Sequence, residues 1–193
     1  MGLPIGFNPP CRMNLKTDSP PPGSRLEPGG GEGFYGDLVF APADPLNSAE
    51  MAEIFLLREA IEPKLVAEAT RRMGASKIAA AHAINEESEA CQEDEDSEGY
   101  LLADRRFHEL IFDASGLRRA HALVKGVWTT ADPYRQAYAI IPNKLDISVI
   151  EHRMILDAIE RGAGEDAGEL HRIHIRHTRL GLSERREALG ERP

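Results

Sequence analysis

Four side chains of the kinds that bind metals occur in three separate segments, and each is spaced to face an apolar interior. Asp104 and His108 stand four residues apart, so on a helix they share one face. That face also carries Leu101 and Ile111. Burying ionisable groups without a partner is costly. A metal ion is the simplest partner for such a pair.

Two later segments repeat this pattern with histidine. His152 lies on an apolar stripe with Leu156 and Ile159. His174 follows Leu170 by one helical turn. One carboxylate and three imidazoles would suit zinc, nickel, manganese or iron. The spacing therefore predicts a metal site formed by three segments that are distant in the sequence.

The other histidines are less informative. His171, His174 and His177 follow one another at three-residue intervals, which spreads them over about 120° of a helix surface. Helix phase alone leaves open which one or two of them point inward. His82 and His121 fall in no comparable arrangement, and we interpret them as ordinary histidines without a metal.

The composition limits the classes of function. A chain of 193 residues has room for one domain and a tail, and its net charge of -9 argues against a protein that wraps nucleic acid or coats an anionic membrane. No apolar run approaches the roughly 20 residues that span a bilayer. The first residues lack the basic and apolar regions of a secretory signal. We therefore expect a cytoplasmic protein.

Residues 1–46 hold most of the prolines and much of the glycine, which predicts an irregular leader. Within it, the apolar stretch 34–40 is consistent with one strand or half of a short β-hairpin. From Ser48 onward the apolar residues follow a helical period, with Pro63 expected to kink or split the first helix.

Five more helices are expected, over residues 76–92, 98–114, 118–137, 148–161 and 165–188. Ser148 and Glu151 have the spacing of a capping box, which predicts that the helix carrying His152 starts at Ser148. The expected fold class is all-α, an antiparallel bundle of six to seven helices over residues 47–190. Facing helices of a bundle can build a site in its core.

The sequence lacks the common catalytic motifs. His108-Glu109 does not continue into the His-Glu-x-x-His pattern of zinc proteases, and the glycine run 29–33 is not followed by the Lys-Ser/Thr of a phosphate-binding loop. No Gly-x-Ser-x-Gly elbow is present. We therefore expect a metal site without an enzymatic reaction.

Four segments together resemble a known family. They are Leu57-Arg58 to Pro63, Asp104 to His108 leading into Ala114-Ser115-Gly116, Glu151-His152-Arg153 to Ile159, and Ala167 with His174-Ile175 seven residues later. Their order and spacing resemble the C-terminal effector (FCD) domain of FadR-type regulators in the GntR family, over residues 48–188.

The resemblance implies an all-helical domain that binds a divalent metal, zinc, nickel or manganese, through Asp104, His108, His152 and His174. It thus selects His174 where helix phase could not. It also implies a small carboxylate effector that reaches the metal, with Arg58 as a candidate anchor for the carboxylate. A structural ion pair is the other interpretation of Arg58.

The family also implies a homodimer that binds operator DNA through a winged helix-turn-helix. Residues 21–26 are similar to the segment that leads into such a motif, and residues 31–39 to the wing that follows it. The recognition helices expected between them are absent. Leu117 also replaces the asparagine usual after Ser-Gly. We therefore predict a regulator that retains its metabolite sensor and has lost its DNA reader.

Two alternatives stay open at the level of sequence. The first is a metal-dependent enzyme acting on small organic acids, which would need a general base beside the metal. The second is a dimerising interaction module that lacks DNA binding. Turnover of organic acids would favour the first, and mixed dimers with an intact relative would favour the second.

Overall fold

The computed structural model describes residues 48–188, with side chains up to residue 185. Within that range the chain forms six helices and no strand: α1 (Ser48–Thr70), α2 (Ala75–Glu93), α3 (Ser97–Ala114), α4 (Arg118–Ala139), α5 (Lys144–Glu160) and α6 (Gly164–Ala188). The predicted all-α bundle is confirmed. The predicted irregular leader, with its hairpin and winged-helix remnants, lies outside the described residues.

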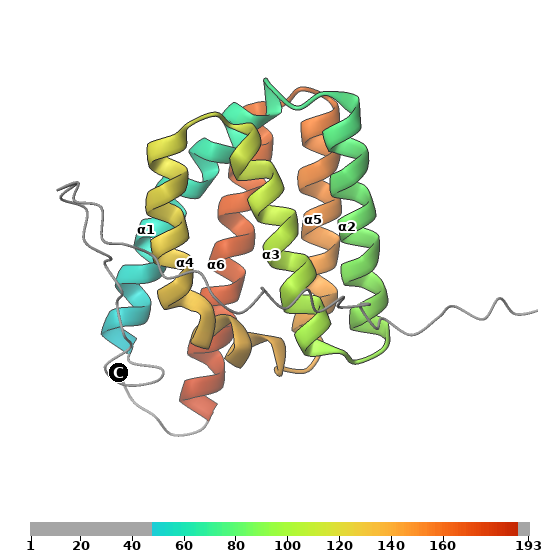
Figure 1. Cartoon of the computed structure of the whole chain (residues 1–193). Coiled ribbons are helices and arrows are strands. Elements are labelled where there is room, and N and C mark those ends of the chain that lie inside the picture. Colours follow the sequence, from blue (N-terminus) through green and yellow to red (C-terminus); the bar gives the residue numbers. More distant parts are fainter. Residues whose placement is uncertain (1–47, 189–193) are drawn as a thin grey trace, which may run out of the picture.

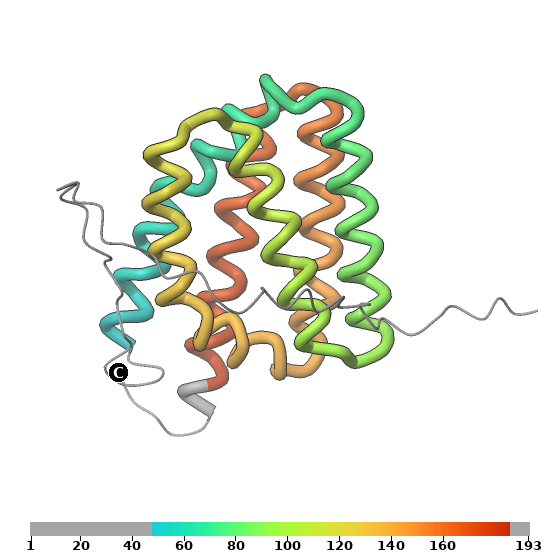
Figure 2. Tube along the Cα trace, viewed as in Figure 1, coloured from blue at the N-terminus to red at the C-terminus, as the bar shows by residue number. Residues whose placement is uncertain are grey.

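The helices run up and down and are joined by short connections at both ends of the bundle (Figures 1 and 2). Helix α6 lies between α1 and α5 and packs against both, whereas α3 packs against α1, α2 and α4. Every helix thus has a face directed at a shared interior. Such an interior can receive side chains from several helices at one level.

Among the described residues, the two larger of three apolar clusters fill the interior at different levels, and the third, smaller one consists of Cys91, Tyr100 and Val149. The first apolar cluster includes Leu65 and Ala69 of α1, Ile111 of α3, Leu156 of α5 and Ala167 of α6. The second apolar cluster lies toward the other ends of three of the same helices and consists of Met51, Ile54, Phe55, Val127, Ala131, Tyr134, Tyr138, Ile175 and Leu182. Burial of this apolar surface is the main source of stability.

Between the two clusters lies a set of buried polar side chains, which we call the polar layer. Its members are Arg58, Glu62, Asn85, Asp104, His108, Arg135, Glu151, His152, His171 and His174. All six helices contribute to it. Helix α1 shows how the polar layer lies between apolar residues. On its buried face the charged positions 58 and 62 are preceded by the apolar position 55 and followed by the apolar position 65.

The prediction that a helix starts at Ser148 is wrong, and of the two outcomes expected at Pro63 the split does not occur. Helix α5 begins at Lys144, after Asn143 in the left-handed conformation (φ 61°), so Ser148 is an interior position and not the cap. Glu151 does not reach back to the helix start because its carboxylate accepts hydrogen bonds from α6. Pro63 does not split α1, which continues through it to Thr70.

Helices α1 and α6 approach each other closely at two glycines. A Cβ atom at Gly164 would lie 2.8 Å from the carbonyl oxygen of Ala67, and one at Gly168 would lie 2.7 Å from that of Pro63. Any larger residue would collide with the α1 backbone at these points. The two glycines, one turn apart, therefore set the distance between the two helices.

No helix among residues 48–188 is both long enough and apolar enough to cross a bilayer.

Candidate metal and effector site

The four predicted metal ligands meet in the polar layer. Asp104 and His108 come from α3, His152 from α5 and His174 from α6, and one ligand atom of each lies within 4.8 Å of the others. All four side chains are buried. The structure therefore brings together the residues that the sequence spacing and the family resemblance indicated.

Two of the distances within this group match those between ligands of one ion. Asp104 Oδ1 lies 3.4 Å from Nε2 of His108 and 3.4 Å from Nε2 of His152. Two ligand atoms bound tetrahedrally at about 2.1 Å from one metal are roughly 3.4 Å apart. Both Nε2 atoms are buried and have no hydrogen-bond partner. The donor set thus fits a divalent metal, which would complete these lone pairs.

His152 is oriented by a contact from α2. Its Nδ1 lies 3.2 Å from Oδ1 of Asn85, which acts as the acceptor because the amide nitrogen of Asn85 donates to Glu89 at 2.7 Å. A proton on Nδ1 leaves the Nε2 lone pair facing Asp104. Such an outer hydrogen bond is the usual device that fixes the tautomer and direction of a metal-binding histidine.

Glu151 provides the same support for His174. His174 Nδ1 donates to Glu151 Oε2 at 2.8 Å, which leaves Nε2 directed at the ligand group. The other carboxylate oxygen accepts from Nδ1 of His177, a half-exposed residue on the next turn of α6. Glu151 thus links the buried histidine to the surface, and two of the three candidate histidine ligands have an outer partner.

Asp104 also forms an ion pair with Arg135 of α4. Arg135 Nη2 donates to Asp104 Oδ2 and, at 3.3 Å, to the carbonyl of Leu101, while its Nη1 donates to Asp132 at 3.0 Å. The guanidinium lies 4.5 Å from the ring centre of Trp128. Because Arg135 takes Oδ2, the Oδ1 atom of Asp104 remains directed at the histidines.

A second network joins α1, α4 and α6 through Glu62, which is fully buried. Glu62 Oε1 accepts from Arg58 Nε at 2.8 Å and from Trp128 Nε1 at 2.7 Å, and Oε2 accepts from His171 Nε2 at 2.9 Å. The ring of His171 lies 5.0 Å from that of His108. His171 is therefore directed inward but is held by a carboxylate beside the ligand group.

Burial and charge set the protonation of the group. Burial lowers the pKa of His108 to about 3, only partly offset by Asp104, and burial with His174 and His108 lowers that of His152 well below its usual value. Burial would raise the pKa of Asp104, but Arg135 and His108 hold it well below normal. His108 and His152 thus offer neutral imidazoles and Asp104 an ionised carboxylate, which are the forms that bind metals.

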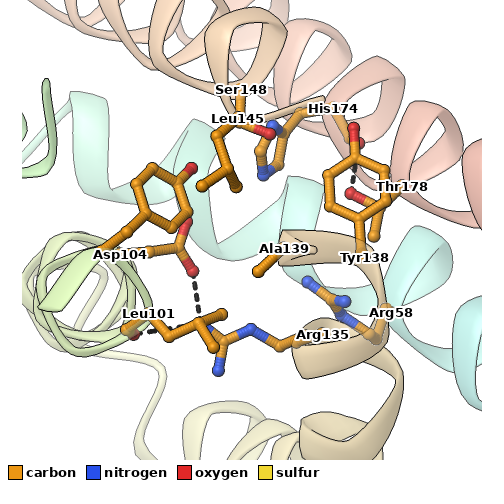
Figure 3. A pocket seen from close by; sticks show the side chains of 11 residues that line it. Arg58, Leu101, Asp104, Arg135, Tyr138, Ala139, Leu145, Ser148, His174 and Thr178 are labelled. Atoms are coloured by element: carbon orange, nitrogen blue, oxygen red, sulfur yellow. Dashed lines mark hydrogen bonds and ion pairs between the residues drawn. The ribbon is translucent and has the colours of Figure 1, made fainter. Parts of the chain in front are cut away.

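A small cavity of about 20 Å³ adjoins the ligand group (Figure 3). Asp104 and His174 form part of its wall, and Arg58 lies across the cavity from Asp104, on the side that also carries Tyr138 and Thr178. The remaining lining residues are Tyr100, Leu101, Arg135, Ala139, Leu145 and Ser148. The predicted carboxylate anchor, Arg58, therefore lies at the cavity, although it also forms the structural ion pair with Glu62.

Tyr100 adds a polar group to the cavity wall. Its side chain is buried, and its hydroxyl has no hydrogen-bond partner. Burial and the carboxylate of Asp104 raise its pKa well above its usual value, so the hydroxyl keeps its proton and acts as a donor. An unpaired buried donor beside a cavity marks a position where a ligand atom can bind.

Sequence reasoning missed four residues of the site: Glu62, Tyr100, Arg135 and Glu151. The signal for Arg135 was available, since it follows Trp128 and Ala131 at the spacing of one buried helix face. Glu62 follows Arg58 by one turn and carries the same signal. Glu151 was assigned to a helix cap, and no local pattern distinguishes Tyr100 from a core tyrosine.

The remaining histidines lie outside the ligand group, as expected. His82 lies near the surface, with Nε2 2.6 Å from the carboxylate of Glu160. His121 has a pKa lowered by partial burial and by Lys125. Neither contacts Asp104 or the histidines of the polar layer.

Comparison with known proteins was consistent with this geometry. The FCD domain model matches residues 53–177. No curated protein sequence matches the chain at a significant level. Among solved structures, Escherichia coli McbR/YncC is similar at a TM-score of 0.68, with 20% identity over 75% of this chain and 76% of that chain.

A second structure, Streptococcus agalactiae GntR, has a TM-score of 0.59 with 21% identity, over 68% of this chain and 59% of that chain. At these identities the structural likeness shows a shared fold. The sequence match to the family model is independent of this structural likeness and covers most of the described helices. The chain therefore belongs to the FCD domain family.

Proposed function

We propose that this chain is a metal-dependent sensor of a small carboxylate metabolite. In this proposal Asp104, His108, His152 and His174 bind one divalent metal, and the effector carboxylate reaches the metal through the adjoining cavity. The observation that carries the proposal is the pair of buried Nε2 atoms without a hydrogen-bond partner, each 3.4 Å from Asp104 Oδ1. A metal would satisfy both nitrogens at once.

The chemistry of the ligands limits the metal. Three imidazoles and one carboxylate suit zinc, nickel or manganese, whereas calcium and magnesium prefer oxygen ligands only. Four protein ligands leave further positions open in five- or six-coordinate ions. The metal would supply a positive charge and an open position for the effector carboxylate.

Arg58 supports the choice of an anionic effector. Its Nε and Nη2 atoms are bonded to Glu62, at 2.8 and 3.5 Å, and no acceptor for Nη1 is found among the described residues. The guanidinium lines the cavity opposite Asp104 (Figure 3). A carboxylate bound between the metal and Arg58 would therefore meet positive charge at both ends.

Helix α1 connects the proposed effector site to the N-terminal segment. It carries Arg58 and Glu62, and it is the helix that follows the N-terminal segment of residues 1–47. Effector binding at Arg58 would change how α1 sits relative to the other helices, and this relative displacement is how occupancy would reach an attached segment or partner. We propose a cytoplasmic homodimer as the working assembly and, from the sequence of residues 21–39, a sensor with a reduced DNA reader.

Elemental analysis of the purified protein tests the metal site. We expect about one equivalent of metal in the parent after incubation with zinc, nickel or manganese. The double variant His108→Ala with His152→Ala should contain almost none. The matched control, His82→Ala with His121→Ala, should keep the metal because both residues lie outside the ligand group.

Circular dichroism of both double variants separates loss of ligands from loss of fold. The proposal is contradicted by a folded parent that takes up none of the three metals. Equal metal content in the parent and in the folded His108, His152 variant would contradict the ligand assignment.

A further inference from the structure

The hydroxyl of Tyr100 is the polar group of the cavity that the proposed function leaves unused. Tyr100 lies on α3 one turn before Asp104 and is 3% exposed. Its hydroxyl is buried without a hydrogen-bond partner, and its side chain lines the cavity. Buried hydroxyls in folded proteins nearly always have an acceptor. Among the described residues the hydroxyl of Ser148 is a polar neighbour of this group, but the two do not form a hydrogen bond of normal geometry.

The position of this hydroxyl is distinct from that of Arg58. The cavity has two sides, one with Arg58, Tyr138 and Thr178, and one with Leu101, Asp104 and Leu145 (Figure 3). Tyr100 shares its helix face with Asp104, because the two are four residues apart. A carboxylate held between the metal ligands and Arg58 would thus leave the Tyr100 hydroxyl free for another part of the same molecule.

Other hydrogen-bond donors of the cavity wall already have acceptors within the protein. Arg135, the other cation of the cavity, donates to Asp104, Leu101 and Asp132. Thr178 donates its hydroxyl proton to the carbonyl of His174 at 3.2 Å. Unlike Arg135 and Thr178, Tyr100 therefore has a proton still to donate at this wall.

We propose that Tyr100 donates a hydrogen bond to a second oxygen of the effector, so that the site selects small carboxylic acids with a further hydroxyl or carboxylate. The inference rests on the proposed function, since the metal and Arg58 hold the first carboxylate. The cavity of about 20 Å³ has room for about one water molecule, so it must widen to admit an acid, and the smallest acids require the least widening. An acid that presents a methyl group to Tyr100 leaves the donor unpaired and binds more weakly.

Isothermal titration of the zinc-loaded protein tests this selectivity. Propionate, 3-hydroxypropionate and malonate each have three carbons and differ in the group that terminates the chain. We expect 3-hydroxypropionate or malonate to bind about tenfold more tightly than propionate. The Tyr100→Phe variant should reduce that preference to about threefold or less while its affinity for propionate stays unchanged.

A second tyrosine provides the matched control. Tyr134 is also buried, but its hydroxyl donates to Glu50 at 3.1 Å and does not line the cavity. Tyr134→Phe should therefore keep the full preference for the acids with a second oxygen. Zinc content and circular dichroism of both variants confirm that the metal site and the fold are intact.

The outcomes separate this inference from the proposed function. Binding of none of the three acids by the zinc-loaded protein would overturn both. Equal affinities for all three acids in the parent, or a preference that survives in a folded, zinc-loaded Tyr100→Phe variant, would overturn the role of Tyr100 alone. In that second case the metal and Arg58 would remain sufficient to explain binding.

Discussion

The polar layer and the first apolar cluster use the same helices but contribute to folding in opposite ways. Leu65 and Leu156 of the apolar cluster are fully buried, and removing their surface from water stabilises the bundle. Glu62 and His152 of the polar layer are buried as deeply. Their removal from water opposes folding and is offset only where a hydrogen bond or an opposite charge is in place.

This difference indicates that separate regions of the bundle provide stability and ligand binding. The apolar clusters supply the stability that holds the six helices together. The polar layer uses part of that stability to hold charged and metal-binding groups away from water. Polar groups that the chain leaves unpaired, as at His108, are then available to a ligand. Changes in the two regions should therefore have separable effects on stability and on binding.

The largest expected difference between the regions is their response to acid. The pKa of His108 is about 3 in the folded protein and 6.5 without the fold, and that of His152 is also lowered. Between these values only the unfolded chain carries the extra protons, so the stability present above about pH 6.5 falls as the pH decreases. Each histidine contributes up to about 1.4 kcal/mol for each pH unit.

Denaturant unfolding of the metal-free protein at several pH values measures this loss. We expect the free energy of unfolding to fall steadily from pH 6.5 to pH 4. The lowered pKa values of Asp104 and Glu62 add a loss in the same direction at still lower pH. A free energy of unfolding that is the same at pH 7 and pH 5 would show that the polar layer does not resist protonation.

The apolar cluster should respond most strongly to loss of volume. Leu65→Ala removes a fully buried side chain and is expected to lower the free energy of unfolding by about 2–5 kcal/mol. The zinc content and the slope of stability against pH should not change. The exposed Leu56, 68% accessible, gives a control in which alanine alters stability by less than about 0.5 kcal/mol. Loss of zinc from a folded Leu65→Ala protein would contradict the separation.

The smallest expected effect is an increase in the free energy of unfolding, whereas the two changes above decrease it. His108 has no hydrogen-bond partner on either ring nitrogen, and His108→Leu replaces it with an apolar side chain of similar size. We expect the metal-free protein to become about 1–2 kcal/mol more stable at pH 7, because an unpaired buried polar group is removed. Zinc should then no longer raise the melting temperature.

The surface variant His82→Leu provides the comparison, since the exposed His82 pairs with Glu160 of α5 and lies outside the ligand group. It should keep the stabilisation by zinc. A metal-free His108→Leu protein that is less stable than the parent would indicate that His108 contributes to packing more than it costs in unpaired polar surface.

The order of the helices and the group of metal ligands were readable from the sequence, because both depend on local periodicity. Asp104 and His108 share a face by virtue of a four-residue spacing. His174 was different: its phase relative to His171 and His177 was ambiguous, and only the family resemblance selected it. In the structure His171 is also buried, but Glu62 occupies its Nε2 atom.

The partners of the ligands could not be derived in this way. Glu62 is 66 residues before Trp128 and 109 residues before His171, so its contacts join helices that are distant in the sequence. Glu151 illustrates how a local rule misleads, since its spacing from Ser148 is that of a capping box. In the folded chain the same carboxylate accepts hydrogen bonds from α6, and a tertiary contact replaces the local one.

The glycine contacts between α1 and α6 have a mechanical consequence. Gly164 and Gly168 bring the two backbones so close that the helices form one stiff frame, which carries Arg58 on one member and His174 on the other. Widening that frame would break its close backbone contacts, so we expect a molecule that enters the cavity to displace α3, α4 and α5 rather than these two helices. The helix that follows the N-terminal segment thus acts as the fixed reference against which an occupied site displaces the rest of the bundle.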